Sequence, residues 1–318
     1  MIGIGVIGAG GNGAGHARYY RQSPRSRLVA IADPDLKRAE AVAAECGVRA
    51  CADYVDFLPD VDAVVISSPN HLHRDHAVAC AEAGRHIYCE KPMGLNAGQA
   101  AEIARAVQGA GVRCVVGFSV RFSDTLQTMQ RYLSEGRVGR LVSLWTRRLF
   151  HMKAGGPASW RSDHALSGGV LLEINSHELD WMMAFGGEVR SVYARTYAED
   201  QRGPMANDHV WVTMSFADGA VATLEGSQIS AVPQFDRGIM GLGGAIETRR
   251  WGQDLHFARR GSEAVQVEPD GAFDLRAHFL DCIEQGVPCV ADADWGLKVM
   301  TVADAIFESA ASGKVQAL

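Results

Sequence analysis

A glycine-rich turn between two short apolar segments constrains the fold of this chain more than any other feature. Segment 2–7 contains only apolar residues and glycine and runs into the sequence GAGGNG at residues 8–13. A second apolar segment, 28–32, ends at Asp33. Glycines let a strand turn sharply into a helix, and their missing Cβ atoms let a pyrophosphate approach the first helical amides. The pattern predicts a dinucleotide-binding strand–turn–helix–strand unit. The residues of the turn expected to touch the cofactor are Gly8, Gly10, Gly11, Asn12 and Gly13.

Asp33 bears on which dinucleotide binds. A carboxylate at the end of the second strand can accept hydrogen bonds from both ribose hydroxyls, and it repels a 2′-phosphate. NAD is therefore the expected cofactor. Lys37 and Arg38 follow closely and leave NADP as the alternative.

Residues 1–120 show the sequence pattern of a doubly wound α/β domain. Strand-like apolar runs at 4–7, 28–32, 63–66, 86–89 and 112–116 alternate with helix-like stretches. Continuous apolarity is typical of parallel strands covered on both faces, so a Rossmann domain is expected over residues 1–120. Ligands of such sheets lie beyond the carboxyl ends of the strands. The residues that follow the third and fourth runs and are expected to face the cofactor are Ser68, Pro69, Asn70, His73, Glu90 and Lys91.

Two of these residues allow a structural interpretation as well. Asn70 is expected to cap the helix that follows it. His73 either touches the cofactor region or satisfies backbone groups. His71 and His76 lie nearby, but only His73 and His76 share a helical face closely. One such pair without a clear third ligand does not predict a metal site, and none is expected elsewhere.

Residues 121–318 are expected to form an α+β domain. The chain pattern predicts helices at 123–135 and 167–185, a strand at 141–148 and a Gly/Pro loop at 154–157. Strands at 189–197, 208–216, 220–227 and 245–249 are separated by turn signals, which favours antiparallel pairing. Two closing helices, 274–284 and 295–312, complete the domain and can pack across the domain boundary.

Composition excludes several classes of protein. The formal net charge is -6 and charges of both signs are mixed along the chain, so a nucleic-acid partner is not expected. No apolar run is long enough to cross a membrane, and the first strand begins at once, without a signal peptide. We expect a cytoplasmic protein without a membrane partner. The seven cysteines form no CxxC pair and are interpreted as reduced core residues.

Lys91 is the sharpest candidate for chemistry in the first domain. It follows a buried strand within Glu90-Lys91-Pro92, where its ammonium can bind a substrate hydroxyl and favour the alkoxide. The structural alternative is an ordinary solvent-facing lysine at a strand end.

A polar stripe on the apolar helix predicted at 167–185 supplies the second candidate. Glu173, His177 and Asp180 share one face if that helix is continuous. Histidine can take a hydroxyl proton near neutral pH, and Glu173 can orient it. The alternative is a hydrogen-bonded seam between domains. Arg121, Trp160 and Arg161 are candidate substrate contacts, or structural cation–π and ion-pair groups.

With these motifs assembled, the chain resembles the Gfo/Idh/MocA oxidoreductase family over nearly its whole length. The glycine turn, Asp33, Ser68-Pro69-Asn70 with His73, Glu90-Lys91-Pro92, Trp160-Arg161, Gly168-Gly169 and the segment from Glu173 to His177 occur in the family's order. The resemblance implies a Rossmann domain, a C-terminal α+β domain with a large, mostly antiparallel open sheet, and a sugar or polyol site between them. It also implies that Lys91 and His177 are catalytic and that the protein is a homodimer or homotetramer, built partly through the open sheet face.

The chain departs from the family pattern at two positions. Glu173 stands where many members carry aspartate, and Asn175 stands where they often carry glycine. Asn175 is therefore added to the candidate substrate contacts, and both residues bear on which substrate is used.

Three functions follow from the sequence. The first is an NAD-dependent dehydrogenase that oxidises a secondary hydroxyl of a sugar, sugar derivative or cyclic polyol, with Lys91, His177 and Glu173 as catalytic residues. The second is a redox-assisted glycosidase or epimerase in which NAD is reduced only transiently. The third is a non-catalytic NAD-binding sensor.

Overall fold

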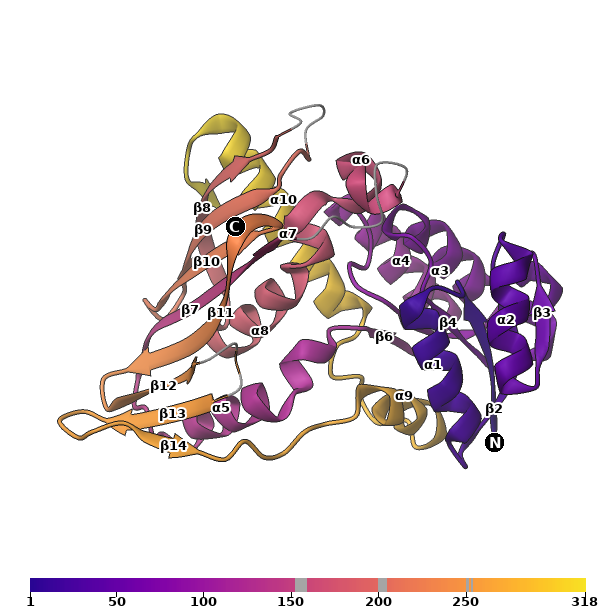
Figure 1. The fold of residues 1–318 in the computed structure, drawn as a ribbon, viewed down its shortest axis with the longest axis horizontal. Helices are drawn as coiled ribbons and strands as arrows, with labels where there is room; N and C mark the ends of the chain where they lie inside the picture. The colour runs from indigo at the N-terminus through magenta and orange to yellow at the C-terminus, as the bar shows by residue number, and fades with distance from the viewer. Residues whose placement is uncertain (152–158, 200–204, 250–251, 253) are drawn as a thin grey trace. The chain divides into compact units, whose positions relative to one another are not determined.

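The chain forms two compact units in the computed structural model, which describes residues 1–151, 159–199, 205–249, 252 and 254–318 (Figure 1). The first unit contains Met1–Gly117 and Leu275–Met300, and the second contains Phe118–Asp274 and Thr301–Leu318. Helix α9 (Leu275–Glu284) therefore belongs to the first unit, and α10 (Ala293–Ser312) begins in the first unit and ends in the second. The Gly/Pro loop expected at 154–157 lies outside the described residues.

The first unit is built on a six-stranded parallel sheet with the order β3-β2-β1-β4-β5-β6. Its strands are β1 (Ile2–Ile7), β2 (Ser26–Ala32), β3 (Arg49–Cys51), β4 (Ala63–Ile66), β5 (His86–Cys89) and β6 (Cys114–Val116). Its first four helices are α1 (Gly11–Gln22), α2 (Leu36–Cys46), α3 (His73–Glu82) and α4 (Ala97–Ala110). The doubly wound Rossmann sheet is confirmed, and β3 is a strand that the apolar pattern did not predict.

Local chemistry explains where these elements begin and end. Strands β1 and β4 are buried along their whole length, as parallel strands covered on both faces require. Helix α2 is capped by Asp35, whose side chain accepts from the Arg38 amide, and it ends at Gly47 with φ +67°. Glycine adopts such a left-handed conformation without steric cost.

The second unit contains a nine-stranded sheet with the order β14-β13-β12-β11-β7-β10-β9-β8-β15. Only the β7–β10 pairing is parallel; the other neighbours are antiparallel. The strands are β7 (Leu141–His151), β8 (Val189–Tyr197), β9 (His209–Phe216), β10 (Val221–Ser227), β11 (Ile229–Gly241), β12 (Gly244–Arg249), β13 (Asp254–Arg259), β14 (Val265–Val267) and β15 (Gln316–Ala317). The helices of this unit before α10 are α5 (Asp124–Ser134), α6 (His164–Ser167), α7 (Gly169–Glu173) and α8 (Ser176–Gly186). The α+β class and the mostly antiparallel sheet are confirmed.

Strand β11 is the largest element that the sequence did not predict. It contains Pro233, and its register with β7 shifts between Ile229 and Gln234. Such a bulge interrupts the alternation by which a strand is recognised.

The single helix predicted at 167–185 is wrong, because the structure divides this segment into α7 and α8. Asn175 lies at the division, fully buried, and its Nδ2 donates to the Val170 carbonyl at 3.0 Å. The amides of Ile174 and Asn175 both donate to that same carbonyl. This double use breaks the regular helical pattern, so Glu173 ends one helix and His177 lies in the first turn of the next.

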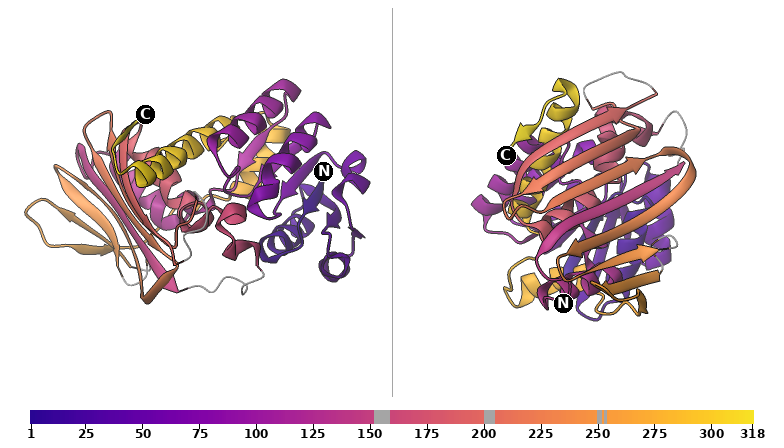
Figure 2. Two further views of the ribbon diagram at one scale, coloured as in Figure 1. Left: turned by 90° about the horizontal axis from the view of Figure 1, so that it is seen from above. Right: turned by 90° about the vertical axis from the view of Figure 1, so that its left-hand side faces the viewer.

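One face of the nine-stranded sheet is covered by helices and the other is not. Helix α7 contacts β9 and β10, and α8 contacts β7 and β10. The right panel of Figure 2 looks onto the opposite face, where no described helix of this unit lies in front of the strands. Within the described part of the chain, no helix is both long enough and apolar enough to span a lipid bilayer.

Candidate active site

The glycine turn after β1 is packed too tightly for side chains at two of its positions. Gly8 has φ +96°, and a Cβ on Gly13 would lie 1.8 Å from the Gly8 carbonyl oxygen. A Cβ on Gly10 or Gly11 would have no protein atom within 4 Å. Gly8 and Gly13 are thus required by packing, whereas Gly10 and Gly11 leave open space at the N-terminus of α1. That space and the first-turn amides of α1 suit the pyrophosphate of a dinucleotide.

Asp33 lies directly after β2 and is held in place by the turn. One carboxylate oxygen, Oδ2, accepts from the Ala9 amide at 2.9 Å, and Oδ1 accepts from the Asp35 amide at 2.9 Å. Arg38 reaches the same carboxylate, with Nη1 3.2 Å from Oδ1. A carboxylate oriented by the glycine turn is placed to accept from ribose hydroxyls.

The turn after β4 is tied to the turn after β5 by His73. Its Nδ1 lies 2.7 Å from the Pro92 carbonyl oxygen and its Nε2 lies 2.9 Å from the Ser68 carbonyl oxygen. The side chain is almost completely buried, and burial lowers its pKa although the two backbone contacts act in the opposite direction. Two roles were predicted for His73, and these contacts correspond to the second, in which it satisfies backbone groups.

Asn70 does not cap a helix as predicted. It is the buried first residue of a short 3-10 turn, Asn70–Leu72, and α3 then begins at His73 without a side-chain cap. Ser68 also departs from a purely cofactor-facing role, since its hydroxyl lies 2.9 Å from Nδ1 of His76. Pro69 precedes the 3-10 turn in an extended conformation.

Glu90 and Lys91 follow β5, whose partner β4 lies beside β1. They therefore lie at the carboxyl ends of the parallel strands, where the glycine turn and Asp33 also lie. The Glu90 carboxylate Oε1 lies 2.8 Å from Nε2 of His16 on α1. Burial raises the pKa of Glu90, but His16, Lys91 and His73 outweigh burial and lower it. Glu90 is thus a carboxylate beside Lys91.

In the second unit, Arg161 and Glu173 are brought together. Arg161 belongs to a 3-10 turn, Trp160–Ser162, and its Nε donates to Oε1 of Glu173 at 2.8 Å. Its guanidinium also lies over the Trp160 ring, 4.3 Å from the centroid. The predicted Trp160-Arg161 motif and the last residue of α7 therefore form one half-exposed cluster.

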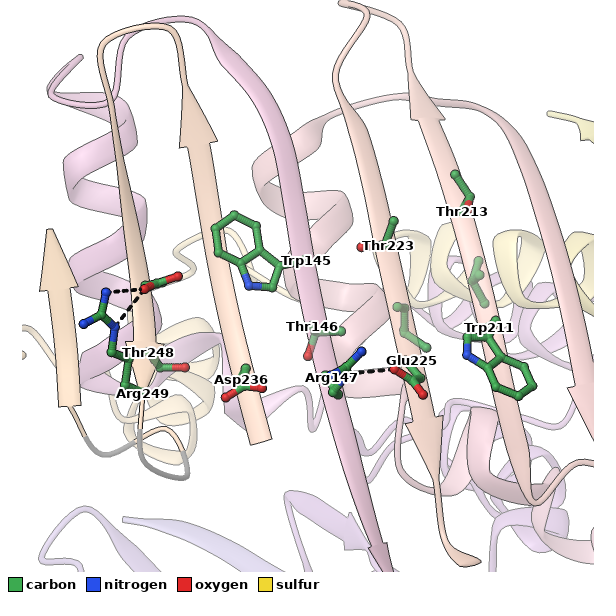
Figure 3. Close-up of a pocket in the computed structure, with 13 residues that line it drawn as sticks. Trp145, Thr146, Arg147, Trp211, Thr213, Thr223, Glu225, Asp236, Thr248 and Arg249 are labelled. Carbon is green, nitrogen blue, oxygen red and sulfur yellow. Dashed lines mark hydrogen bonds and ion pairs between the residues drawn. The ribbon is translucent and has the colours of Figure 1, made fainter. Parts of the chain in front are cut away.

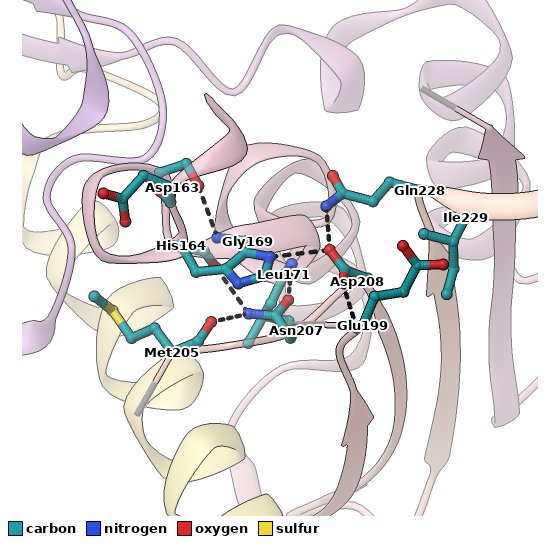
Figure 4. Close-up of polar contacts among 12 residues, drawn as sticks. Asp163, His164, Gly169, Leu171, Glu199, Met205, Asn207, Asp208, Gln228 and Ile229 are labelled. Atoms are coloured by element: carbon teal, nitrogen blue, oxygen red, sulfur yellow. Dashed lines mark hydrogen bonds and ion pairs between the residues drawn. The ribbon is translucent and has the colours of Figure 1, made fainter. Parts of the chain in front are cut away.

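Asn207 holds the start of α7 (Figure 4). Its Oδ1 accepts from the Leu171 amide at 2.8 Å and its backbone carbonyl accepts from the Val170 amide at 3.0 Å. Its Nδ2 donates to the Gly168 carbonyl at 3.1 Å. Gly169 must lack a side chain, because a Cβ there would lie 2.3 Å from Nδ2 of Asn207. Asn207 thus positions the helix that ends in Glu173.

Asp208 holds the segment before α7 in a similar way (Figure 4). Its Oδ1 accepts from Nε2 of His164 at 2.9 Å and from Nε2 of Gln228 at 2.6 Å. Burial raises the pKa of Asp208, but the hydrogen bonds from His164 and Gln228 outweigh burial and lower it. An ionised Asp208 therefore links α6, which follows Arg161 closely, to the sheet.

Glu178 anchors α8, one residue after His177. This fully buried carboxylate accepts from Nη2 of Arg237 at 2.7 Å and from Nε1 of Trp181 at 2.6 Å. Burial raises the pKa of Glu178, but Arg237 and Arg148 outweigh burial and hold the pKa well below its ordinary value. The ion pair fixes the first turn of α8 to strands β7 and β11.

The remaining predicted substrate contacts are buried. Arg121 pairs with Asp180, with Nε 3.3 Å from Oδ2, and lies over the Phe122 ring. Asn175 packs so closely against β10 that a Cβ on Gly226 would lie 2.0 Å from its Nδ2. Both residues are bound to the protein's own groups.

Sequence reasoning missed four residues that organise the site: His16, Glu178, Asn207 and Asp208. His16 lies one turn after Gly13 on α1, and Glu178 lies beside His177, so both had a local signal in the motifs already found. Asn207 and Asp208 lie far from those motifs along the chain, and no local pattern distinguishes them from a polar turn.

Comparison with known proteins gives the same assignment for both units. A family model described as "Oxidoreductase family, NAD-binding Rossmann fold" matches residues 2–118, and a second, "GFO/IDH/MocA C-terminal domain", matches residues 126–247. "Inositol 2-dehydrogenase 4" of Saccharopolyspora erythraea is 30% identical over 305 residues, covering 91% of this chain and 84% of that protein. The chain belongs to the Gfo/Idh/MocA oxidoreductase family.

Other members of the Gfo/Idh/MocA family are similar at the same level. "2,7-anhydro-N-acetylneuraminate hydratase" of Escherichia coli is 27% identical, covering 81% of this chain and 72% of that protein. The solved structure "Levoglucosan dehydrogenase, complex with NADH" is 26% identical with a TM-score of 0.89, covering 99% of this chain and 98% of that one. As a Gfo/Idh/MocA member this chain has an NAD-binding Rossmann fold, and the open glycine turn with its oriented Asp33 fits that cofactor.

Proposed function

We propose that this protein is an NAD-dependent dehydrogenase that oxidises a secondary hydroxyl of a sugar, sugar derivative or cyclic polyol. The observation that carries the proposal is the position of Lys91. It follows β5 at the carboxyl ends of the parallel strands, where the open glycine turn and Asp33 also lie. An ammonium at this edge lies where an open α/β sheet binds its ligands. The names of the inositol and levoglucosan dehydrogenases support the substrate class.

NAD would be held by the amides at the start of α1 and by Asp33. When bound, NAD accepts the hydride from the carbon that carries the hydroxyl. Asp33 favours NAD over NADP because its carboxylate, held by the Ala9 and Asp35 amides, repels a 2′-phosphate. Arg38 Nη1 lies 3.2 Å from Oδ1 of the same carboxylate, and this guanidinium is the reason that NADP stays the alternative. We also place Gly11, Asn12, Ser68, Pro69, Asn70, His73 and Glu90 along the cofactor.

Lys91 and His177 are assigned to the same reaction by their chemistry. His177 accepts the hydroxyl proton as the base, since imidazole titrates near neutral pH. The Lys91 ammonium stabilises the negative charge that develops on the hydroxyl oxygen. Glu173 positions the base and is itself held by Arg161 at 2.8 Å.

Trp160 and Arg161 are the proposed direct substrate contacts of the second unit. The guanidinium of Arg161 is half-exposed, as is the ring of Trp160 on which it lies. Arg121 and Asn175 support the site through their buried partners, Asp180 and the Val170 carbonyl. This division separates residues that can meet a sugar hydroxyl from residues that hold the scaffold.

We further propose that the protein is a cytoplasmic homodimer or homotetramer that pairs through the uncovered face of the nine-stranded sheet. A hollow of about 660 Å³ on this sheet is lined by Trp145 and Trp211, among others (Figure 3). Ion pairs flank the two rings, including Arg147 with Glu225 at 2.7 Å. Trp211 is exposed and Trp145 half-buried, and accessible tryptophans beside paired charges are typical of an interface with a second protein surface.

The decisive experiment follows NADH absorbance and product release together across a panel of inositols, aldoses, anhydrosugars and glycosides. Net NADH formation that requires one of these substrates supports the proposal. Product without net NADH overturns it in favour of a redox-assisted reaction. Failure of every substrate, together with strong stabilisation by NAD, overturns it in favour of a sensor.

Variants then test the two catalytic assignments. Lys91→Ala is expected to keep its affinity for NAD while kcat falls by about 10²–10³-fold. His177→Gln is expected to lower kcat by about 10²–10⁴-fold and to remove the acidic limb of the pH profile. Lys298→Ala, at an exposed position of α10, is the control. Near-wild-type turnover in Lys91→Ala would refute its assignment.

A further inference from the structure

The outer edge of β6 is covered by residues 285–292, the loop between α9 and α10. β6 is the last strand of its sheet, and its Val116 amide donates to the Ala291 carbonyl at 2.7 Å. Arg113 reaches the same loop, with Nη2 3.3 Å from the Gly286 carbonyl oxygen. Alternate amides of an edge strand point outward. Cys114, two residues before Val116, lines the same cavity as Cys289 of the loop.

A second thiol lies near this one. Cys282, near the end of α9, contacts the ring nitrogen Nε2 of His278, and the same nitrogen accepts from the amide of Val290, the residue that follows Cys289. Cys282 is completely buried, whereas Cys289 is half-exposed. The pair therefore has one sulfur that solutes can reach and one behind it.

His278 supplies a base for the buried thiol. It lies one helical turn before Cys282, and its Nε2 is 3.3 Å from the Cys282 Sγ. The Val290 amide donates to the same Nε2 at 3.2 Å. A ring nitrogen that accepts an amide hydrogen is the unprotonated one, so Nε2 can take the Cys282 proton when it exchanges the Val290 amide for the thiol.

The charges around the pair favour ionisation of Cys289 first. The hydrogen bond from Cys282 lowers the pKa of Cys289, and Arg113 and the Cys114 amide act in the same direction, against burial and Asp292. The hydrogen bond to Cys289 and burial raise the pKa of Cys282, and Asp281 adds to this effect. Of the two thiols, the accessible Cys289 is therefore the one that loses its proton more readily.

A cavity gives an oxidant access to that sulfur. Its volume is about 390 Å³, and Cys289, Cys114, Arg113 and Pro288 are among the residues that line it. The other five cysteines, in contrast, are buried. Burial also raises the pKa of these five thiols. Reactive cysteines are those whose thiolate is both stabilised and accessible.

We propose that Cys289 and Cys282 form a peroxide-sensitive thiol pair that closes to a disulfide. The Cys289 thiolate attacks one oxygen of a hydroperoxide; the O–O bond breaks, a sulfenic acid forms, and the departing oxygen leaves as water or an alcohol after protonation. Cys282 then attacks the sulfenic sulfur while His278 takes its proton. The S–S bond forms, and the hydroxide that leaves takes a proton from His278 to become water. Two thiols supply the two electrons that reduce the peroxide.

The test treats the whole protein with stoichiometric hydrogen peroxide and maps thiols by differential alkylation and peptide mass spectrometry. We expect a disulfide between the Cys282 and Cys289 peptides, formed about tenfold or more faster than any other thiol is oxidised. Cys282→Ala is expected to leave Cys289 as a sulfenic acid that dimedone traps. Cys46→Ser is the control and should form the disulfide as the wild type does.

Three outcomes would overturn the proposal. In the first, Cys46 or Cys51 is oxidised faster than Cys289. In the second, dimedone traps no more sulfenic acid at Cys289 in Cys282→Ala than in the wild type. In the third, dimedone labels Cys282 in Cys289→Ser as fast as Cys289 is oxidised in the wild type. Because Cys282 lies in the core, its variant is first checked for the wild-type melting transition. If that variant does not fold, His278→Gln replaces it, and the disulfide should form more slowly while the sulfenic acid accumulates. An unchanged rate of disulfide formation in His278→Gln would equally contradict the mechanism.

Discussion

The imidazole of His16 and the carboxylate of Glu90 meet at 2.8 Å, which joins helix α1 to the turn that carries Lys91. The helix whose N-terminus suits the pyrophosphate is thereby linked to the proposed catalytic lysine. His16 also packs on the Tyr88 ring of β5, 4.9 Å between centroids. Cofactor binding and the lysine turn therefore share one rigid contact.

Loss of His16 should disturb Glu90 more at low pH than at high pH. His16 lowers the pKa of Glu90 against burial, so in His16→Ala the carboxyl stays protonated to a higher pH and its charge beside Lys91 is lost. We expect kcat to fall by about tenfold near pH 6 and by less near pH 8. Arg18→Ala, on the exposed side of the same helix, is the control. Equal losses at both pH values would show that His16 acts through packing alone.

Gly10 of the turn and Gly15 of α1 offer a test of cofactor binding without a packing defect. A Cβ at Gly10 or at Gly15 meets no protein atom within 4 Å. Gly10→Ala should fold normally yet bind NAD about tenfold or more weakly, because the methyl group occupies the path of the pyrophosphate. Gly15→Ala should bind NAD as the wild type does. Calorimetric titration measures both, and equal affinities would exclude the pyrophosphate from Gly10.

Asn207 should be essential to α7. Asn207→Ala removes the acceptor of the Leu171 amide and the donor to the Gly168 carbonyl. Leaving these groups unpaired in the interior is expected to cost about 3 kcal/mol in the free energy of unfolding. Turnover should fall with it, because Glu173 ends that helix. Asn96→Ala, which removes only the cap of α4, should cost about 1 kcal/mol. Denaturant titration compares the two, and similar losses would argue against a special role for Asn207.

Half-buried His76 should make the protein less stable in mild acid. Burial, with the charge of His73 and His71 against that of Asp75 and Asp53, lowers the pKa of His76 to about 4. The unfolded chain binds the proton near pH 6.5, so stability is complete above that pH and is lost as the pH falls toward about 4. In His76→Asn the melting temperature should fall less between these pH values than in the wild type. His256→Asn, in the second unit, is the control; an unchanged pH dependence in His76→Asn would contradict the prediction.

The uncovered sheet face should determine the oligomeric state. Trp211 is 49% exposed and lines the hollow on that face. Trp211→Glu places an unpaired charge where two copies are proposed to meet, and light scattering after size exclusion should report monomers. Val55→Glu, at a similarly exposed position of the first unit, should leave the assembly intact. A wild-type protein that is already monomeric would refute the proposed pairing.

The accuracy of the sequence-based predictions followed the range of the interactions involved. Three strands were predicted at their observed bounds: β4 (Ala63–Ile66), β5 (His86–Cys89) and β8 (Val189–Tyr197). Burial on both faces of a strand requires a continuous apolar sequence, and burial on one face requires an alternating one. The continuous helix at 167–185 was wrong: the amide and the Nδ2 of Asn175 both donate to the Val170 carbonyl, and the same side chain packs against Gly226 of a strand distant in the chain. No local propensity announces such a contact.

The glycine turn, Asp33 and the Glu90-Lys91 pair could be identified along the chain because backbone geometry at strand ends demands particular residue types at short spacing. The groups that the polar side chains contact could not be identified in this way. Whether His73 met cofactor or carbonyl oxygens, whether Asn175 faced outward, and which partners held Glu90, Glu173 and Glu178 were decided only when segments far apart in sequence packed together. A buried polar group must find a partner within about 3 Å, and which partner lies within that reach is a property of the tertiary structure.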